Sequence, residues 1–438
     1  AKTYAARVRA AGPKAFVPAI TLRSTDPTLT KNIARIDAVA GARRLPRLRV
    51  LGPTATWAAP ILGTVAEASA EQIKASDGLL EPGDSMGQRG LEYRYDTRLR
   101  GTPGLSVRAV TKGADGSAID KRELFAEASA EGEPLTTTLD SAAQNAAEAA
   151  LAKQTKHPSA LVAVRASTGE ILAAAVGPGT KGAPLALAGK EAPGSTFKIA
   201  SSLANVRKGA TATTLLPCTD TLTVGGRVFG NYSDYPRAKL GKIPMATAFA
   251  YSCNTAFISQ YRKVSQTDLA AAAASLGMGE DLDLSFTGFL GSVPATGDPV
   301  EHAASFIGQG RVEASPLAMA LVTASVVKGR TVRPALIKGA DPLPPPPKPL
   351  TAKEAGVLRT EMRAVVTEGS GKVLAKAGVT YAKTGTAEFG TADPPQTHAW
   401  MVAGRGDIAI AAYNELGPSG TTHAAPFIIS FLKAYDQK

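Results

Sequence analysis

The six residues Pro193-Gly-Ser-Thr-Phe-Lys198 decide the fold predicted for this chain. A Pro-Gly pair directly before Ser195 is typical of the turn that leads into a helix. Apolar residues follow at helical spacing and give that helix a face for the core: Ile199, Leu203 and Val206. The stretch therefore predicts Ser195 at a helix start, with Lys198 one turn further along the same face.

This placement has a chemical consequence. Side chains three residues apart on a helix are neighbours, so the Lys198 amine can reach the Ser195 hydroxyl. The first helical turn also offers free backbone N–H groups and the positive end of the helix dipole to an acyl oxygen. Burial or a second cation would lower the pKa of a lysine and free its amine to act as a base. The alternative is an exposed helix start with an incidental serine and lysine.

A second Ser-x-x-Lys match begins at Ser325, inside the apolar run 316–327. A serine within such a run is predicted to lie in the middle of a buried helix, with its hydroxyl bonded to the backbone.

A second motif, Ser252-Cys-Asn254, separates two apolar segments, 243–250 and 255–261. It predicts a tight connection between helices, with Ser252 and Asn254 pointing the same way. Serine and asparagine at such a junction are often only helix caps. In the functional interpretation, Ser252 passes a proton between Lys198 and a leaving group, and Asn254 holds an amide oxygen of the substrate.

The third motif, Lys383-Thr-Gly-Thr386, lies in a β-type segment, 379–388. Glycine inside a strand marks a close approach to the backbone, for which a substrate carboxylate is a candidate. Lys383 is the candidate second cation. Strand alternation separates Lys383 and Gly385 from the two threonines, so twist or a bulge is needed to bring all of them to one site. The alternative is an edge strand protected by a lysine.

The order of the three motifs resembles the class B penicillin-binding proteins, which are monofunctional peptidoglycan transpeptidases. Five further segments are similar to the same family: 89–96, 99–104, 136–140, 163–172 and 308–320. The resemblance covers about residues 80–438. It implies an α+β chain with a non-catalytic, dimerisation-type pedestal domain at 1–135 and a transpeptidase domain at 136–438. The transpeptidase domain of this family has a five-stranded antiparallel sheet flanked by helices.

The sequence places the elements of this domain. A helix is expected over 140–151 with Asp140 as its cap, and a last helix over 425–435. The strands are expected at 161–166, 170–176, 379–388, 398–403 and 408–413.

The resemblance also implies the chemistry. Ser195 would attack a D-Ala-D-Ala stem peptide and form an acyl-enzyme, in an oxyanion hole made by the N–H groups of Ser195 and Thr386. The expected catalytic residues are Ser195, Lys198, Ser252, Asn254 and Lys383, and the expected substrate-binding residues are Thr384, Gly385 and Thr386. β-Lactams would acylate the same serine, and no cofactor or metal is expected. The alternatives are a D,D-carboxypeptidase, a serine β-lactamase or, less favoured, a β-lactam sensor or scaffold.

Composition fits this interpretation. The net charge of +12 over 438 residues suits work beside an anionic envelope. Nucleic-acid binding is disfavoured because aromatic residues make up only 5% and the basic residues are scattered, apart from one cluster at 43–49. No apolar run is long enough to span a bilayer. We expect an extracytoplasmic, membrane-attached protein whose anchor is absent from this chain, with cell-division or elongation proteins as possible partners.

Three observations stay open or point to structural roles. Cys218 and Cys253 could form a disulfide outside the cytoplasm or be two unrelated thiols. His302 and His398 have no carboxylate clearly placed for either, so structural roles are predicted. The proline-rich segment 341–350 is predicted to be a stiff surface loop before a helix that a capping box starts at Thr351, with a polyproline ligand for a partner as the alternative.

Overall fold

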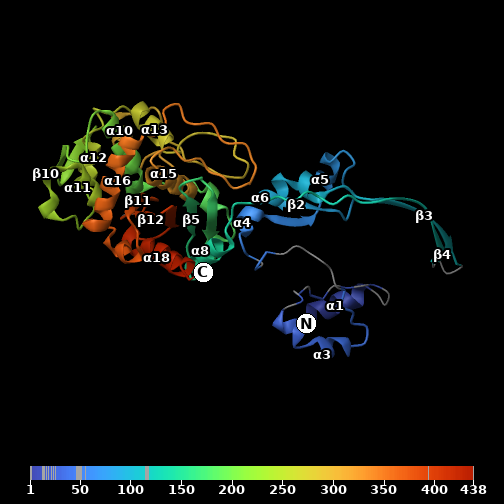
Figure 1. The fold of residues 1–438 in the computed structure, drawn as a ribbon. Coiled ribbons are helices and arrows are strands. Elements are labelled where there is room, and N and C mark those ends of the chain that lie inside the picture. The colour runs from blue at the N-terminus through green and yellow to red at the C-terminus, as the bar shows by residue number, and fades with distance from the viewer. Residues whose placement is uncertain are drawn as a thin grey trace. The chain divides into compact units, whose positions relative to one another are not determined.

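The computed structural model describes the whole chain except residues 1, 12–14, 16, 18, 21, 23, 25, 46–51, 55, 114–117, 393 and 438 (Figure 1). The chain divides into two compact units, Ala1–Gly52 and Pro53–Lys438. The described residues of the first unit form three short helices: α1 (Lys2–Ala11), α2 (Pro27–Thr30) and α3 (Ile33–Asp37). Part of the basic cluster at 43–49, from Pro46 onward, lies outside the described residues. No helix in the described part of the chain is both long and apolar enough to cross a bilayer.

The second unit begins with small, mixed elements. Its strands form two antiparallel pairs, β1 (Thr64–Glu67) with β2 (Ser85–Arg89) and β3 (Leu105–Lys112) with β4 (Ala118–Glu127). The helices are α4 (Ala59–Leu62), α5 (Ala70–Ala75), α6 (Gly90–Arg94) and α7 (Asp96–Arg100). Ile61 and Leu91 are buried in the same apolar core as the large sheet that follows. The Trp57 indole N–H also donates to Asn145 Oδ1 at 2.8 Å, so this segment packs onto the rest of the unit.

A five-stranded antiparallel sheet forms the centre of the second unit, in the order β11-β12-β13-β5-β6. Its strands are β5 (Ser159–Arg165), β6 (Ile171–Val176), β11 (Tyr381–Phe389), β12 (Gln396–Arg405) and β13 (Ile408–Asn414). All five predicted strands are present, with both ends of each strand within two residues of those expected. The predicted fold class is therefore confirmed, and the strand that carries Lys383 lies at an edge of the sheet.

Helices pack against this sheet (Figure 1). Helices α8 (Ser141–Leu151) and α18 (Ala425–Tyr435) contact each other as well as the sheet, and α15 (Pro316–Lys328) crosses β5, β12 and β13. Asp140 caps α8 as predicted, because its carboxylate accepts from the Ala143 N–H at 2.8 Å. Ser325 is buried within α15 and its hydroxyl donates to Leu276 O at 3.1 Å, so the second Ser-x-x-Lys match is the satisfied mid-helix serine that was expected.

A helical lobe is inserted in the chain between β6 and β11. The elements that carry or support the first two motifs are η2 (Gly194–Phe197), α10 (Lys198–Arg207), α11 (Met245–Ala250), α12 (Asn254–Ile258) and α16 (Ala352–Thr367). The other elements of the unit are η1 (Pro178–Thr180), α9 (Leu185–Ala188), β7 (Leu215–Cys218), β8 (Thr221–Val224), β9 (Arg227–Gly230), η3 (Arg237–Lys239), β10 (Gly241–Pro244), α13 (Gln266–Ser275), α14 (Pro299–Ser305), η4 (Lys372–Ala377) and α17 (Gly420–His423).

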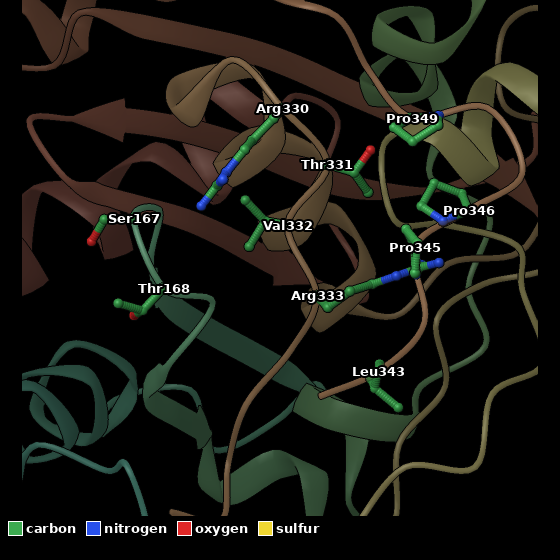
Figure 2. Close-up of a pocket in the computed structure, with 10 residues that line it drawn as sticks. All are labelled: Ser167, Thr168, Arg330, Thr331, Val332, Arg333, Leu343, Pro345, Pro346 and Pro349. Atoms are coloured by element: carbon green, nitrogen blue, oxygen red, sulfur yellow. The ribbon is translucent and has the colours of Figure 1, made fainter. Parts of the chain in front are cut away.

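The proline-rich segment 341–350 is a surface loop, followed by the predicted capping box, in which Thr351 and Glu354 start α16. Together with residues 330–333 and the β5–β6 turn at Ser167, the loop lines a cavity of about 360 Å³ (Figure 2). The Arg333 guanidinium, drawn beside Pro345 in Figure 2, donates to Pro344 O at 2.9 Å. No residue of the three motifs lines this cavity.

Candidate active site

The nucleophile segment begins with a 3-10 turn, η2, and the α-helix proper starts at Lys198. The predicted helix start is therefore correct in place, but its first turn is tighter than an α-helix. Gly194 has a φ of +52°, and a Cβ at this residue would lie 2.3 Å from the Thr386 carbonyl oxygen of β11. Its N–H donates to Gly308 O at 2.9 Å. Only glycine allows the nucleophile turn to lie directly against the Lys383 strand.

Lys198 is completely buried and its Nζ has four polar neighbours. They are Asn254 Oδ1 at 2.7 Å, Ser252 O at 2.8 Å, Ser195 Oγ at 3.0 Å and Ser252 Oγ at 3.2 Å. The two nearest neighbours can only accept hydrogen bonds. A neutral amine has two N–H groups for these two acceptors, which leaves its lone pair for a hydroxyl. The arrangement thus suits an amine that takes the proton of Ser195.

The electrostatics of the site favour the neutral amine. Burial first, and the charge of Lys383 second, hold the pKa of the Lys198 amine well below its usual range. Lys383 is also completely buried, and burial lowers its pKa to about 7. Two ammonium groups cannot share so small a buried volume without cost, so the structure disfavours protonation of both at once.

Ser252 lies between the two amines, with its Oγ 3.2 Å from Lys198 Nζ and 2.9 Å from Lys383 Nζ. The Lys383 amine also donates to Thr384 O at 2.9 Å. Ser252 has a φ of +59°, which is a left-handed backbone that few serines adopt. Strain of this kind persists only where the surroundings hold it in place, and it is common at functional sites.

A disulfide between Cys218 and Cys253, with Cα atoms 6.2 Å apart, lies beside this strained residue and answers the question that the sequence left open. Asn231 Oδ1 accepts from the Asn254 N–H at 2.8 Å, and the Thr255 hydroxyl donates to Thr219 O at 2.8 Å. These contacts fix the loop that carries Ser252 to the segments around β7 and β9.

The Asn254 side chain is already engaged at both ends. Its Oδ1 accepts from Lys198, and its Nδ2 donates to Gly230 O at 3.0 Å. The second N–H of this amide is the group that remains for the substrate oxygen predicted above.

The Lys383 strand pairs with β12 in regular register from Tyr381 to Phe389, without a bulge. A Cβ at Gly385 would lie 2.8 Å from Pro193 O and 2.9 Å from the Thr196 methyl group. The close approach that this glycine permits is therefore that of the nucleophile turn of the chain itself. The Thr384 hydroxyl lies 2.8 Å from Ser370 Oγ, and Thr386 is half-buried with its carbonyl against Gly194.

One expectation about histidines is wrong. His398 does have a carboxylate placed for it, because its Nε2 lies 3.2 Å from Glu191 Oε2. No local pattern indicates this contact, since Glu191 precedes the nucleophile segment and His398 follows the Lys383 strand. His302 packs between the rings of Tyr261 and Phe306, in agreement with a structural role.

The structure thus gathers Ser195, Lys198, Ser252, Asn254 and Lys383 into one hydrogen-bonded group at the edge of the sheet. A half-buried serine bonded to a buried lysine, beside a lysine-bearing edge strand on a five-stranded antiparallel sheet, defines the class of lysine-dependent, penicillin-interacting serine proteins.

Family comparisons agree with this class. The model described as "Penicillin binding protein transpeptidase domain" matches residues 159–406, and that described as "Penicillin-binding Protein dimerisation domain" matches residues 30–137. The chain belongs to the penicillin-binding protein transpeptidase family, and the predicted resemblance to its class B members is confirmed.

Individual curated relatives match only part of the chain. The peptidoglycan D,D-transpeptidase PbpA of Mycobacterium tuberculosis is 31% identical over 232 residues, which is 48% of this chain and 46% of that protein. PbpA of Mycolicibacterium smegmatis is 32% identical over 230 residues, with the same coverage of 48% and 46%. The chain therefore spans about half the length of the curated relatives it matches.

Two solved structures are similar over a longer part of the chain. One is a chain of a peptidoglycan synthase complex, with a TM-score of 0.68 and 27% identity. The match covers 86% of this chain and 74% of that chain. The ceftriaxone acyl-enzyme complex of penicillin-binding protein A from M. tuberculosis has a TM-score of 0.62 at 25% identity and covers 70% and 80%.

Proposed function

We propose that this chain is a serine D,D-transpeptidase that cross-links peptidoglycan stem peptides through an acyl-enzyme on Ser195. One observation carries the proposal: the buried Lys198 amine lies 3.0 Å from Ser195 Oγ while two pure acceptors take its N–H groups. The similarity to the peptidoglycan D,D-transpeptidases PbpA and to the acyl-enzyme of the M. tuberculosis protein supports it.

In the proposed reaction, Ser195 Oγ attacks the carbonyl carbon between the two D-Ala residues while Lys198 takes its proton. The Ser195 and Thr386 N–H groups stabilise the oxyanion. The proton passes through Ser252 to the nitrogen of the last D-Ala, which leaves as the C–N bond breaks. An amine of a second stem peptide then attacks the ester, forms the cross-link and returns Ser195 to its hydroxyl form.

Lys383, Thr384 and Thr386 are proposed to bind the terminal carboxylate of the donor peptide, and Asn254 and the backbone at Gly385 to hold its amide groups. The Thr384 hydroxyl already has Ser370 Oγ at 2.8 Å. If the Ser370 hydroxyl donates to Thr384 Oγ1, the proton of Thr384 remains available for the carboxylate. Ser370 therefore does not prevent the contact.

The division at residue 135 into a pedestal and a catalytic domain is part of the proposal. The protein is proposed to work at the extracytoplasmic face of a bacterial membrane, with division or elongation proteins as partners. The Cys218–Cys253 disulfide supports an oxidising compartment.

Labelling with a fluorescent penicillin tests the function. A lasting adduct is expected on Ser195, absent in Ser195→Ala and retained in Lys328→Ala, which alters only the second Ser-x-x-Lys match. Release of the label within seconds would indicate a β-lactamase instead. Folded protein that forms no adduct would favour a scaffold. Incubation with a D-Ala-D-Ala peptide and an acceptor amine separates the remaining alternative, because a carboxypeptidase releases D-Ala without joining the two peptides.

A further inference from the structure

The segment before the nucleophile is held from β12 by two side chains. His398 and Trp400 are two residues apart on this strand, so their side chains leave the same face of the sheet. The Trp400 indole N–H donates to Ala192 O at 2.9 Å, and His398 Nε2 lies 3.2 Å from Glu191 Oε2. Glu191 and Ala192 are the fourth and third residues before Ser195.

The surroundings of His398 favour a hydrogen bond to Glu191. The ring is 5% exposed and stacks on Phe389, with ring centroids 3.9 Å apart and planes 5° from parallel. Its Nδ1 lies 2.8 Å from Glu415 O, a carbonyl that can only accept. The carboxylate of Glu191 at Nε2 is also only an acceptor. A hydrogen bond that Nε2 donates to the Glu191 carboxylate is charge-assisted, and such a bond is stronger than one between two neutral groups.

The remaining neighbour of the pair is Tyr413, whose hydroxyl lies 3.1 Å from His398 Nδ1. Burial, and then the carboxylates of Glu191 and Glu415, raise the pKa of this hydroxyl above its ordinary value, so it stays protonated. Tyr413 therefore adds a neutral polar group to the pair and no competing charge.

The backbone of the segment has little freedom to shift. Glu191 exchanges two hydrogen bonds with Ala314, of 3.1 and 2.8 Å, and Gly194 donates to Gly308. On the other side, Gly194 meets Thr386 O without room for a Cβ. On the side of the segment that faces β12, the contact between Glu191 and His398 holds it in place. Because these contacts surround the segment closely, we expect a shift of the Glu191 side chain or backbone to change the position of Ser195 as well.

We propose that the Glu191–His398 pair is a positioning element of acylation: it holds residues 191–194 on β12, so that Ser195 Oγ stays aligned with Lys198 and with the edge of β11. His398 and Glu191 are positioning residues and do not touch the substrate. The inference rests on the proposed function, because it assigns the pair to the acylation of Ser195.

The test uses the full chain and four variants: Glu191→Gln, which keeps the shape and removes the charge, His398→Gln, the double variant, and Asp436→Asn as the control. Asp436 forms an ion pair of 2.6 Å with Arg405, at the far end of the same strand. Stopped-flow labelling with a fluorescent penicillin over a range of concentrations gives the dissociation constant and the limiting acylation rate constant separately. Melting temperatures report the stability of each variant.

We expect Glu191→Gln to lower the limiting acylation rate constant about tenfold, with the dissociation constant unchanged, as for the loss of one charge-assisted contact. The double variant should be no slower than the slower single variant, because both changes remove one interaction. Asp436→Asn should acylate at the wild-type rate.

A wild-type rate constant in Glu191→Gln, or single effects that add in the double variant, would overturn the positioning role. The positioning role would also be overturned if Asp436→Asn lost as much of the acylation rate constant, in proportion to a fall in its melting temperature. Glu191 is partly exposed, so this variant is expected to fold even if His398→Gln does not. Failure of the wild-type chain to form any adduct would instead refute the proposed function, and the two failures are thereby distinguished.

Discussion

At the scale of the residue, the site depends on two buried lysines that share one serine hydroxyl. Ser252 Oγ lies within 3.2 Å of both amines, and neither lysine is exposed to solvent. Lys383 donates hydrogen bonds, and its charge also lowers the pKa of Lys198, after burial, which is the larger cause.

A first prediction concerns Lys383→Met and the pH dependence of acylation. In the proposed mechanism the neutral form of Lys198 accepts the proton of Ser195, so the acylation rate should rise with pH through the pKa of Lys198. Removing the nearby charge raises that pKa, and the acidic limb of the profile should move to higher pH. Penicillin acylation from pH 5 to 9 measures the limb, with Lys328→Met as the control. A limb that stays in place would show that burial alone sets the pKa.

Glu361 is a buried carboxyl that the proposed mechanism does not use. It is completely buried, hydrogen-bonded to Ser202, and burial raises its pKa to about 8 from 4.5. The folded chain therefore keeps this proton up to about pH 8, while the unfolded chain releases it above 4.5. The resulting contribution to stability is complete below pH 4.5 and is lost as the pH rises through 8.

The second prediction follows from this sign. Between pH 5 and pH 8 the wild-type chain should lose more stability than Glu361→Gln, by roughly 3 to 4 kcal/mol. Melting temperatures at the two pH values measure the difference, and the exposed Glu388→Gln is the control. Equal pH slopes for the wild type and Glu361→Gln would mean that Glu361 is ionised in the folded chain.

At the scale of the element, the site is a contact between the turn η2 and the strand β11. The third prediction tests it with two glycines that both have a left-handed backbone. Gly194→Ala places a methyl group 2.3 Å from Thr386 O, whereas Gly182→Ala meets no atom within 4 Å. Because a shift of about 1 Å can cost about 100-fold in rate, we expect Gly194→Ala to lose penicillin acylation to this degree.

Gly182→Ala should lose about 1 kcal/mol of stability, since the left-handed backbone disfavours a side chain, and should acylate normally. Similar acylation in the two variants would show that η2 and β11 can separate without loss of the site.

At the scale of the whole molecule, the compact unit that begins at Pro53 includes more than the predicted catalytic domain. Trp57 and Ala58 bond to Asn145 and Glu148 of α8, at 2.8 Å in each case, and Ile61 lies in the common core. The Tyr95 hydroxyl donates to Ser285 O at 2.9 Å. Residues 53–95 thus stabilise the part of the chain that carries Ser195.

The fourth prediction compares two truncated chains. A chain of residues 53–438 should melt and acylate like the full chain, because residues 1–52 form a unit of their own. A chain of residues 136–438 loses the Trp57 and Ala58 contacts and uncovers apolar side chains, so it should melt about 5 °C or more below the full chain. Differential scanning calorimetry and penicillin labelling measure both. Equal melting of the two truncated chains would show that residues 53–135 add no stability.

The amino-acid sequence alone determined the features that depend on short segments. The three-residue spacing of Ser195 and Lys198, the positions of the five strands, the Asp140 cap and the Thr351 capping box were all predictable. Helix periodicity, apolar strand segments bounded by turns, and caps act between residues a few positions apart, so a short window of sequence contains the whole cause.

Only the tertiary structure decided which distant groups meet. Lys383 contacts Ser252, which is 131 positions away in the sequence, and Cys218 forms a disulfide with Cys253. Thr384 lies beside Ser370, and Glu191 contacts His398. Each of these contacts depends on the packing of the helical lobe against the edge of the sheet and on the register of β11 and β12. No local pattern encodes such proximity, because it is the burial of the common core that brings these segments together.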